Sequence, residues 1–469
     1  MLLWVSCLSL QLVTGLQLLR LGGMFGGAGA APTRTLQFVD NAPTWLVLDG
    51  TLRSLEPPFE RADADDRKKG RGRANHKSNI RLFDAPDGFQ PKVTLYRDQA
   101  AWCPYCEKIW LQLEEKRIPY EVIKNPLSCY GDKSPEFFQV SPSGSLPVAR
   151  INGRIVSESN VIMNVLESEF PSYKPLLPPE GSIERARVPE LLRLERRVFS
   201  SWFSWLTSRA SGGGAAAEMD GLLQEVEAAL MGSGGPYFLG TELSLVDVMF
   251  APFLERMAAS LPYFKGFQSR CSKYPQLLCW YEAMDGREAY AGIKSDYYTH
   301  VHDLPPQIGE CHFSPASELF RAEIDGGSWD VSLDASRCLE PMLPVDANEA
   351  KRDAARALLE NYDAIVKFAC RGAGSKGVPK VRALLADPRA QPDLSLAPAV
   401  DWALRTVLAS MLSSDPSAAS LAAWPEGVPQ AEVGRCLEYL RDRIGVPRDM
   451  TVHGARQLRA HINARLSAA

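Results

Sequence analysis

Apolar positions between residues 93 and 123 change from a strand pattern to a helix pattern and back. Val93 to Tyr96 form a short β-type run, and the apolar positions after it repeat at the spacing of one helix face: Cys106, Ile109, Trp110 and Leu113. The run from Ile118 to Ile123 is rich in β-branched and aromatic residues and predicts a second strand. A strand, a helix and another strand form a βαβ unit, so the two strands should be parallel.

A hairpin and a further helix are predicted next. Val148 to Ile151 and Arg154 to Val156 are strand candidates, and the Asn-Gly pair at 152–153 between them is a hairpin signal. Strands joined in this way are antiparallel. A helix is expected from Ser159 onward. The order of βαβ unit, hairpin and helix predicts a thioredoxin-like α/β domain over residues 91–178.

From residue 183 onward the periodicity is that of helices. Ser244 followed by Asp247 before an apolar run forms a capping box, which predicts the start of a core helix in a domain spanning residues 183–300. Residues 301–469 show no catalytic pattern and should form a helical extension, with helices near 350–366, 400–412, 433–444 and 454–466. The fold class expected is α/β plus all-α: a thioredoxin-like domain, an all-helical domain and a further helical tail.

The first 90 residues are expected to be a leader and a linker. The first nineteen are apolar, a glycine- and alanine-rich stretch follows, and no acidic residue precedes Asp40. Such a segment is typical of a secretory signal, an organellar targeting segment or a membrane anchor, and a start at Met24 is the alternative. Between Pro57 and Lys77 the chain is acidic and then basic, with few apolar residues, which predicts a disordered linker.

Composition narrows the function classes. The 469 residues are enough for two or three domains. A hydrophobic content of 45%, a charged content of 23% and a net charge of −4 describe a soluble globular protein and give no reason to expect nucleic acid as a partner. The basic run from Arg67 to Arg73 is short and is interpreted as solvated. Ten cysteines, scattered apart from one pair, fit a reducing compartment better than a disulfide framework.

The paired cysteines, Cys103 and Cys106, are the candidate chemistry of the chain. Pro104 suits the first position of a helix, because its φ is fixed and its missing N–H would have no partner there. Cys103 then falls near the N-cap, where free N–H groups and the helix dipole favour the thiolate form. This placement predicts a nucleophilic or redox-active cysteine, with Cys106 one turn into the helix.

Two other interpretations of the pair are weighed against this one. Zinc needs about four ligands, usually in paired clusters, whereas the chain has no second CxxC and its six histidines lie away from the motif. A structural disulfide within one helical turn would close a very small loop and stabilise little. Residues 300–312 hold three histidines and Cys311, but in a proline-rich connection without the usual ligand spacing. No metal is therefore expected.

Three motifs together resemble the glutathione transferase superfamily: WCPYC at 102–106, LPV at 146–148 and ES at 158–159. The capping box, followed by alanine and proline, resembles a second signature in the helical domain of that superfamily. The resemblance covers residues 91 to about 292. It implies a cysteine-type member with a thioredoxin-like glutathione-binding domain, a helical C-terminal domain and an extra C-terminal extension.

The resemblance also implies roles for five residues toward glutathione. In such proteins the proline of the LPV turn is cis, the backbone of the next residue pairs with the cysteinyl part, and the ES pair holds the γ-glutamyl group. These roles fall on Pro147, Val148, Glu158 and Ser159. A serine near a helix start offers N–H groups to the γ-glutamyl carboxylate, and the glutamate can pair with its ammonium. Lys133 lies where some members place a basic residue for the glycyl carboxylate, with a solvated lysine as the alternative.

The function expected is that of a glutathione-dependent thiol transferase or reductase, with Cys103 as nucleophile and Cys106 or glutathione as the resolving thiol. Its substrates would be glutathione and a small electrophile or disulfide. The alternatives are a glutathione-conjugating transferase and a non-catalytic scaffold that keeps the fold. A homodimer, and membrane contact through the leader, are further options. The leader favours import into an organelle, with a plastid preferred because the core looks plant- or alga-like, and a cytoplasmic or membrane-anchored protein as the alternatives.

Overall fold

The structure of the protein, a computed structural model, describes residues 36–209, 213–327, 339–341, 345–376, 385, 389–413 and 423–467. Contacts within the chain join Leu36–Ala469 into one compact unit. The predicted leader therefore lies outside the described residues.

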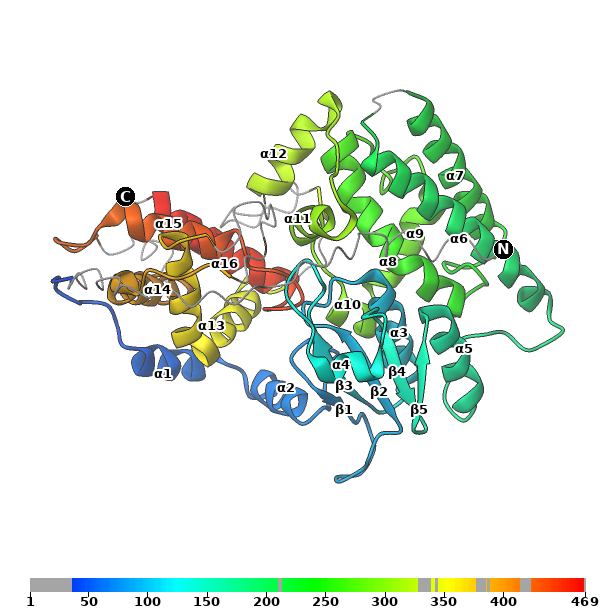
Figure 1. The fold of residues 1–469 in the computed structure, drawn as a ribbon, viewed down its shortest axis with the longest axis horizontal. Helices are drawn as coiled ribbons and strands as arrows, with labels where there is room; N and C mark the ends of the chain where they lie inside the picture. Colours follow the sequence, from blue (N-terminus) through cyan, green and yellow to red (C-terminus); the bar gives the residue numbers. More distant parts are fainter. Residues whose placement is uncertain are drawn as a thin grey trace, which may run out of the picture. The chain divides into compact units, whose positions relative to one another are not determined.

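A five-stranded sheet carries the first domain (Figure 1). Its strands stand in the order β1-β3-β2-β4-β5, in which β2 and β3 are parallel and the other neighbours are antiparallel. The predicted βαβ unit and hairpin are thus confirmed. The strands are β1 (Ile80–Arg81), β2 (Val93–Asp98), β3 (Tyr120–Asn125), β4 (Val148–Ile151) and β5 (Arg154–Ser157).

Local sequence sets the boundaries of the remaining elements of this domain. α3 (Pro104–Lys116) begins at a proline, and its C-cap, Arg117, has a left-handed φ of 56°. Asn152 and Gly153 have φ values of 49° and 82°, which a two-residue Asn-Gly hairpin turn requires. α5 (Ser159–Glu169) packs against α3, and the domain is completed by α4 (Pro135–Val140). The arrangement is thioredoxin-like, as predicted.

The second domain is helical, and its central helix α8 (Leu245–Ser260) is buried along its whole length. The predicted capping box starts this helix: the Asp247 carboxylate accepts hydrogen bonds from the Ser244 backbone N–H at 2.8 Å and from Trp280 Nε1 at 2.9 Å. One hydrophobic core runs through both domains. The other helices here are α6 (Ile183–Thr207), α7 (Gly213–Met231), α9 (Pro275–Asp285), α10 (Glu288–Ile293), α11 (Tyr297–Ile308) and α12 (Glu318–Gly327).

The C-terminal extension has a hydrophobic core of its own, and the N-terminal segment contributes to it. The predicted helices of the extension are confirmed as α13 (Ala347–Ala369), α14 (Ala397–Leu412), α15 (Gln430–Arg441) and α16 (Val452–Ser467). α1 (Trp45–Leu55) lies beside α13 and α14 (Figure 1) and buries Leu48 and Leu52 among them. Trp45 Nε1 also donates to the Asp401 carboxylate at 2.7 Å.

Residues 57–77 are ordered, which corrects the prediction of a disordered linker. They include α2 (Pro58–Lys68), in which the Glu60 carboxylate accepts a hydrogen bond from Arg352 of α13 at 2.6 Å. Just before α2, Glu56 pairs with Arg356, which also belongs to α13. Glu60 and the preceding Glu56 are therefore neutralised by partners 292 and 300 positions away, while Asp63 pairs with Arg67 and Arg73 inside the segment. Composition within a short window carries no trace of such partners.

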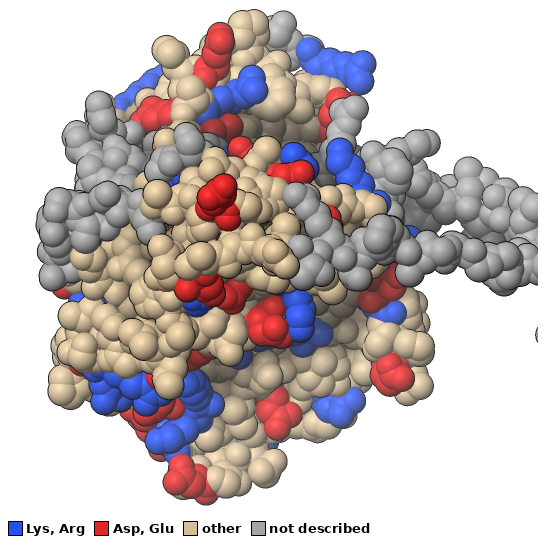
Figure 2. Space-filling model, turned by 90° about the vertical axis from the view of Figure 1, so that its left-hand side faces the viewer, with Lys and Arg blue, Asp and Glu red and all other residues tan. Residues whose placement is uncertain are grey.

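No helix within the described ranges is both long and apolar enough to cross a lipid bilayer. On the face shown in Figure 2, Lys and Arg side chains are interspersed with Asp and Glu. The described part of that face thus offers no extended basic surface of the kind that follows a phosphate backbone.

Candidate active site at the start of α3

Cys103 and Cys106 lie in the first turn of α3. Cys103 is the N-cap residue, with φ −77° and ψ 117°, and it is 6% exposed. Pro104 is the first helical residue, and Cys106, 1% exposed, follows within the helix. The structure therefore puts the pair at the helix start, where backbone N–H groups have no partner within the helix.

A buried carboxylate lies beside the two thiols. Atoms of the Asp98, Cys103 and Cys106 side chains lie within 4.8 Å of one another. Asp98 Oδ2 accepts a hydrogen bond from the Trp102 backbone N–H at 2.6 Å, and Oδ1 is buried without a partner in the described part of the chain. Burial, together with a hydrogen bond to Cys103, raises the pKa of the Cys106 thiol well above its usual value. Cys106 is therefore a protonated thiol at neutral pH.

The same three side chains are residue types that bind metals, so the choice between metal and thiol chemistry needs an argument. A metal-bound cysteine is a thiolate, so metal binding would have to remove the Cys106 proton. Structural zinc sites are held by four ligands, and this group offers three. Within the ranges that the structure describes, no further His, Cys, Asp or Glu joins the group. Thiol chemistry is the function that this group supports better.

Trp102, the residue before Cys103, is held by the helical domain. Its backbone carbonyl accepts hydrogen bonds from Arg256 Nη2 at 2.8 Å and from Gln307 Nε2 at 3.2 Å. Arg256 is fully buried in α8 and also donates to Glu107 of α3 at 2.7 Å. The second domain thus fixes the backbone from which Cys103 projects.

A buried lysine, Lys108, follows the cysteine pair on α3. Lys108 of α3 is 1% exposed, and its Nζ lies 3.7 Å from Glu195 Oε1 and 4.6 Å from the centre of the Phe253 ring. Burial lowers the pKa of Lys108 to about 8, and its charge interacts with that of a Cys103 thiolate. Lys108 is still protonated at neutral pH, so α3 holds a buried positive charge.

Lys133, predicted for the glycyl carboxylate, is a second lysine whose charge interacts with the cysteines. Its ammonium donates a hydrogen bond to Ser128 Oγ at 3.1 Å, and partial burial lowers its pKa. The charge of Lys133 interacts with both Cys103 and Cys106. The charge of this lysine is thus felt at the pair, while its role toward glutathione stays a prediction.

The strand that carries the LPV motif lies next to the strand that leads to the cysteines. The Leu146–Pro147 peptide bond is cis. Val148 opens β4 and is in register with Tyr96 of β2 on one side and Ser157 of β5 on the other. The predicted ligand-binding turn therefore lies at the start of β4, close to the C-terminal end of β2.

Glu158 and Ser159 form the start of α5. Glu158 is the exposed N-cap residue and has a φ of 66°, a left-handed conformation that is uncommon for a residue other than glycine. Ser159 is the first helical residue, so backbone N–H groups without a helical partner surround it. Strained residues of this kind cluster at functional sites. The binding roles of both residues stay predictions.

Sequence reasoning missed Asp98, Arg256 and Gln307. One signal was available: Glu255 and Arg256 are charged residues in the interior of a largely apolar helix, and such residues are rarely buried without partners. The approach of Asp98 to the two thiols depends on the path of the turn at residues 99–102, which periodicity does not give. Gln307 lies about 200 positions from the motif and carries no local signal.

The histidines of residues 300–312 have separate partners. His300 Nε2 lies 2.6 Å from Glu255 Oε1, and His302 Nε2 lies 2.9 Å from Asp325 Oδ1. Cys311 belongs to the first hydrophobic core. Burial lowers the pKa of His300, so its contact with Glu255 is a hydrogen bond of a neutral ring. These side chains serve packing and hydrogen bonding rather than converging on one point.

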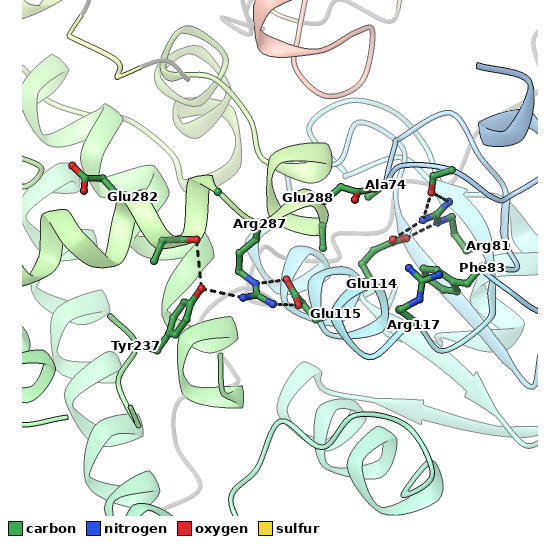
Figure 3. Close-up of a pocket in the computed structure, with 14 residues that line it drawn as sticks. Ala74, Arg81, Phe83, Glu114, Glu115, Arg117, Tyr237, Glu282, Arg287 and Glu288 are labelled. Atoms are coloured by element: carbon green, nitrogen blue, oxygen red, sulfur yellow. Dashed lines mark hydrogen bonds and ion pairs between the residues drawn. The ribbon is translucent and has the colours of Figure 1, made fainter. Parts of the chain in front are cut away.

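A cavity of about 470 Å³ lies away from the cysteines, between the C-terminal part of α3 and helices α9 and α10 (Figure 3). Two ion pairs line it. Arg287 Nε contacts Glu115 Oε1 at 2.6 Å, and Arg287 Nη1 donates to the Tyr237 hydroxyl at 3.0 Å. Arg81 Nε contacts Glu114 Oε1 at 2.8 Å. The Arg287 pair joins the sheet domain to the helical domain, so we interpret this cavity as part of the interface between them.

Two family profiles match the chain. The glutathione S-transferase N-terminal domain matches residues 102–169, and the glutathione S-transferase C-terminal domain matches residues 185–283. The first range contains the cysteine pair and the LPV and ES motifs, and the second contains the capping box. Both ranges end before the extension.

Three relatives from Arabidopsis thaliana show how far the similarity reaches. Glutathione S-transferase DHAR2 is 28% identical over 193 residues, which are 41% of this chain and 84% of that protein. Glutathione S-transferase DHAR3, chloroplastic, is 29% identical over 208 residues, 44% of this chain and 74% of that protein. Glutathione S-transferase L1 is 30% identical over 225 residues, 45% of this chain and 86% of that protein. With the thioredoxin-like sheet and the helical domain behind it, these matches show that the chain belongs to the glutathione S-transferase family.

Proposed function

We propose that the protein is a glutathione-dependent thiol transferase or reductase whose nucleophile is Cys103. The observation that carries the proposal is the position of Cys103 at the N-cap of α3, beside a Cys106 thiol that stays protonated. Helix N–H groups and a hydrogen bond from Cys106 stabilise a thiolate at that position. The charges of Lys108 and Lys133 act in the same direction.

The reaction consists of thiol–disulfide exchanges. The Cys103 thiolate attacks one sulfur of a disulfide R–S–S–R′, forms the mixed disulfide Cys103–S–S–R and releases R′S⁻, which takes up a proton. A glutathione thiolate then attacks the R sulfur, forms the mixed disulfide G–S–S–R and returns the Cys103 thiolate. In a second round the Cys103 thiolate attacks the glutathione sulfur of G–S–S–R and expels RS⁻, which takes up a proton. A second glutathione thiolate then attacks the glutathione sulfur bound to Cys103, which gives glutathione disulfide and the free Cys103 thiolate. In sum, one disulfide and two glutathione molecules give two thiols and one glutathione disulfide.

Cys106 offers a second route for resolving the mixed disulfide. After losing its proton it attacks the Cys103 sulfur, expels RS⁻ and forms a Cys103–Cys106 disulfide, which two glutathione molecules reduce. Asp98 Oδ1 has no other partner in the described part of the chain and lies beside the pair, so it is placed to accept that proton. This route would make the enzyme a dithiol reductase.

Glutathione would lie between the cysteine turn and the starts of β4 and α5. Glu158 pairs with its γ-glutamyl ammonium, Ser159 and the N–H groups at the start of α5 bind the adjacent carboxylate, and Lys133 binds the glycyl carboxylate. Val148 is flanked by paired strands, whereas Leu146 lies outside β4 and its backbone makes no hydrogen bond to the described residues. We therefore propose that the backbone of Leu146, in addition to that of Val148, pairs with the cysteinyl part of glutathione.

The test is a disulfide-reduction assay with glutathione on the wild type and on the Cys103→Ser and Cys106→Ser variants. Cys103→Ser should abolish turnover, because serine offers no thiolate, and Cys106→Ser should only reduce or redirect it. Equal activity in all three proteins would refute the mechanism. A wild type that conjugates electrophiles with glutathione but reduces no disulfide would point to the conjugating alternative.

We also propose import into a plastid. The apolar N-terminal stretch without acidic residues supports it, as does the similarity to a relative described as chloroplastic. A full-length chain with a C-terminal fluorescent fusion should enter plastids, and the same fusion beginning at residue 36 should stay in the cytosol. Identical cytosolic distribution of both fusions would contradict the proposal.

A further inference from the structure

The loop between α15 and α16 reaches the residue that precedes the nucleophile. Trp102 Nε1 donates a hydrogen bond to the Val446 carbonyl at 2.9 Å, and both residues are 1% exposed. These two residues are 344 positions apart, and Val446 lies in the extension that the family profiles leave unmatched. We refer to residues 444–449 as the clamp loop.

The clamp loop fits closely around the indole ring. A Cβ atom added to Gly445 would lie 2.4 Å from Trp102 Cζ2, which is closer than any side chain can approach. The guanidinium of Arg448 lies 4.8 Å from the centre of the same ring, a cation–π contact. Glycine at 445 is therefore what allows the loop to meet the ring edge, while Arg448 covers the ring.

The clamp loop is itself anchored to the start of α11. The Val446 N–H donates to Thr299 Oγ1 at 3.0 Å, and the Val446 carbonyl also accepts from Ser295 Oγ. Arg459, fully buried in α16, pairs with Asp296 and donates to the carbonyl of Ile444. Every one of these partners is buried, so the loop is held by groups that have no water to replace a lost bond.

Trp102 is thus fixed through three separate groups. Asp98 accepts from its backbone N–H, Arg256 and Gln307 donate to its carbonyl, and the extension accepts from its indole N–H. The first two groups hold the main chain. The third group holds the side chain, and it comes from outside the two domains of the family. Since Cys103 follows directly, its direction depends on all three.

We propose that the clamp loop is a positioning element of the catalytic site: by holding the Trp102 side chain, the extension fixes the turn that aims Cys103 along the N-terminus of α3. Its effect on turnover rests on the function proposed above, whereas its effect on the reactivity of Cys103 does not. The extension is then part of the active site rather than an appended domain.

The test uses the full chain and two glycine-to-alanine variants of the extension. Gly445→Ala forces the clamp loop away from Trp102. Gly434→Ala, in α15, is the matched control, because its Cβ would meet only Leu466 Cδ2, at 3.8 Å, and alanine suits a helix better than glycine. Mass spectrometry follows the rate of iodoacetamide modification of Cys103 between about pH 5 and pH 9, circular dichroism follows folding, and glutathione-dependent disulfide reduction follows turnover.

Gly445→Ala should shift the pH midpoint of Cys103 modification upward and lower turnover about ten- to a hundredfold at an unchanged circular dichroism spectrum, because small misplacements of a reacting group have effects of that size. Gly434→Ala should match the wild type in both measurements. Trp102→Phe, which keeps an aromatic ring but removes the N–H donor, should shift the midpoint in the same direction by a smaller amount.

The outcomes separate this proposal from the proposed function. If Gly445→Ala and Trp102→Phe modify like the wild type, the clamp proposal is wrong, whether or not the protein reduces disulfides. If the wild type reduces no disulfide but the two variants shift the modification profile, the proposed function fails and the clamp stands. If Gly445→Ala does not fold, the comparison of Trp102→Phe with Gly434→Ala decides. A pH midpoint of Cys103 modification that is the same in these two variants would then refute the clamp proposal.

Discussion

The two hydrophobic cores of this molecule are assembled in different ways. The first draws on one continuous stretch, from Ala74 to Ile324. The second joins Leu48 and Leu52 of α1 to residues between 354 and 462, so it closes only when segments about 300 positions apart meet. Patterns along the sequence predict the first kind of core well, because its parts are neighbours in the chain. For the second core, such patterns predict the individual helices but do not show that these helices pack together.

The contacts between the cores differ from those inside them. Within each core apolar side chains pack, whereas the junction of the extension with the other two domains adds buried polar contacts to a small apolar cluster that includes Trp102, Tyr298 and Leu385. These polar contacts are the Arg459–Asp296 pair and the hydrogen bonds of the clamp loop. Ion pairs in such surroundings depend strongly on both partners being present. The junction should therefore be more sensitive to single changes of charge than either core is to changes at its surface.

The largest effect is expected from the buried ion pair at the junction. Asp296→Asn keeps the helix cap that Asp296 makes to the Thr299 N–H, but it leaves Arg459 without its charge partner. The free energy of unfolding should fall by about 3–5 kcal/mol in denaturant titrations. The control is Asp49→Asn, which breaks an exposed pair with Arg53 and should cost less than about 0.5 kcal/mol. Equal losses in both variants would mean that the junction is no more sensitive than the surface.

The next effect tests whether α1 belongs to the second core. Leu48 is 2% exposed among the helices of the extension, whereas Leu46, on the same helix, is 81% exposed. Leu48→Ala should lower the free energy of unfolding by about 2–5 kcal/mol, because it removes buried apolar atoms and leaves a cavity. Leu46→Ala should change it by less than about 0.5 kcal/mol. If chemical denaturation finds the two variants alike, α1 does not contribute to this core.

The smallest effect concerns a carboxyl group beside the catalytic turn. Asp303 accepts hydrogen bonds from the Tyr130 hydroxyl at 2.7 Å and from Gln307 Nε2 at 2.5 Å, and burial raises its pKa to about 7. Between its ordinary value of 3.8 and about 7, the folded protein keeps a proton that the unfolded chain has lost. The free energy of unfolding therefore falls as the pH rises through this range.

Asp303→Asn removes this contribution, because the amide does not titrate. Urea unfolding at about pH 5 and pH 8 should show a smaller loss of stability with rising pH in the variant, by up to roughly 3 kcal/mol. The neighbouring charges of Asp98, Arg256 and Arg448 are the same in both proteins, so the difference between the two profiles isolates Asp303. If the free energy of unfolding changed with pH equally in the wild type and the variant, the proton of Asp303 would make no contribution to stability.

Much of the fold and part of the site follow from the sequence for stated physical reasons. Proline at 104, the Asn-Gly pair at 152–153 and the capping box at Ser244 act within a few residues, and each stands where it was predicted. The position of the cysteine pair at a helix start follows from the same local rules. Family membership was also visible, because its motifs are short and contiguous.

The rest depends on pairs that are distant in the sequence. Arg256 and Gln307 approach Trp102 from the second domain, and Val446 approaches it from the extension. The linker prediction failed for the same reason, since Glu60 is neutralised by Arg352 of α13. A charged residue favours a prediction of disorder when the residues near it in the sequence offer no partner. The folded chain can still supply that partner from a distant helix.

The place of α1 beside α13 and α14 has a consequence for synthesis on the ribosome. The two glutathione S-transferase domains can close as soon as their own residues have emerged, since domains generally fold as units during translation. α1 emerges far earlier, yet the helices that cover Leu48 and Leu52 are among the last to be made. Throughout that interval the nascent chain presents two uncovered leucines near its beginning, and a translation arrest before α14 would leave them exposed for chaperones or proteases to find.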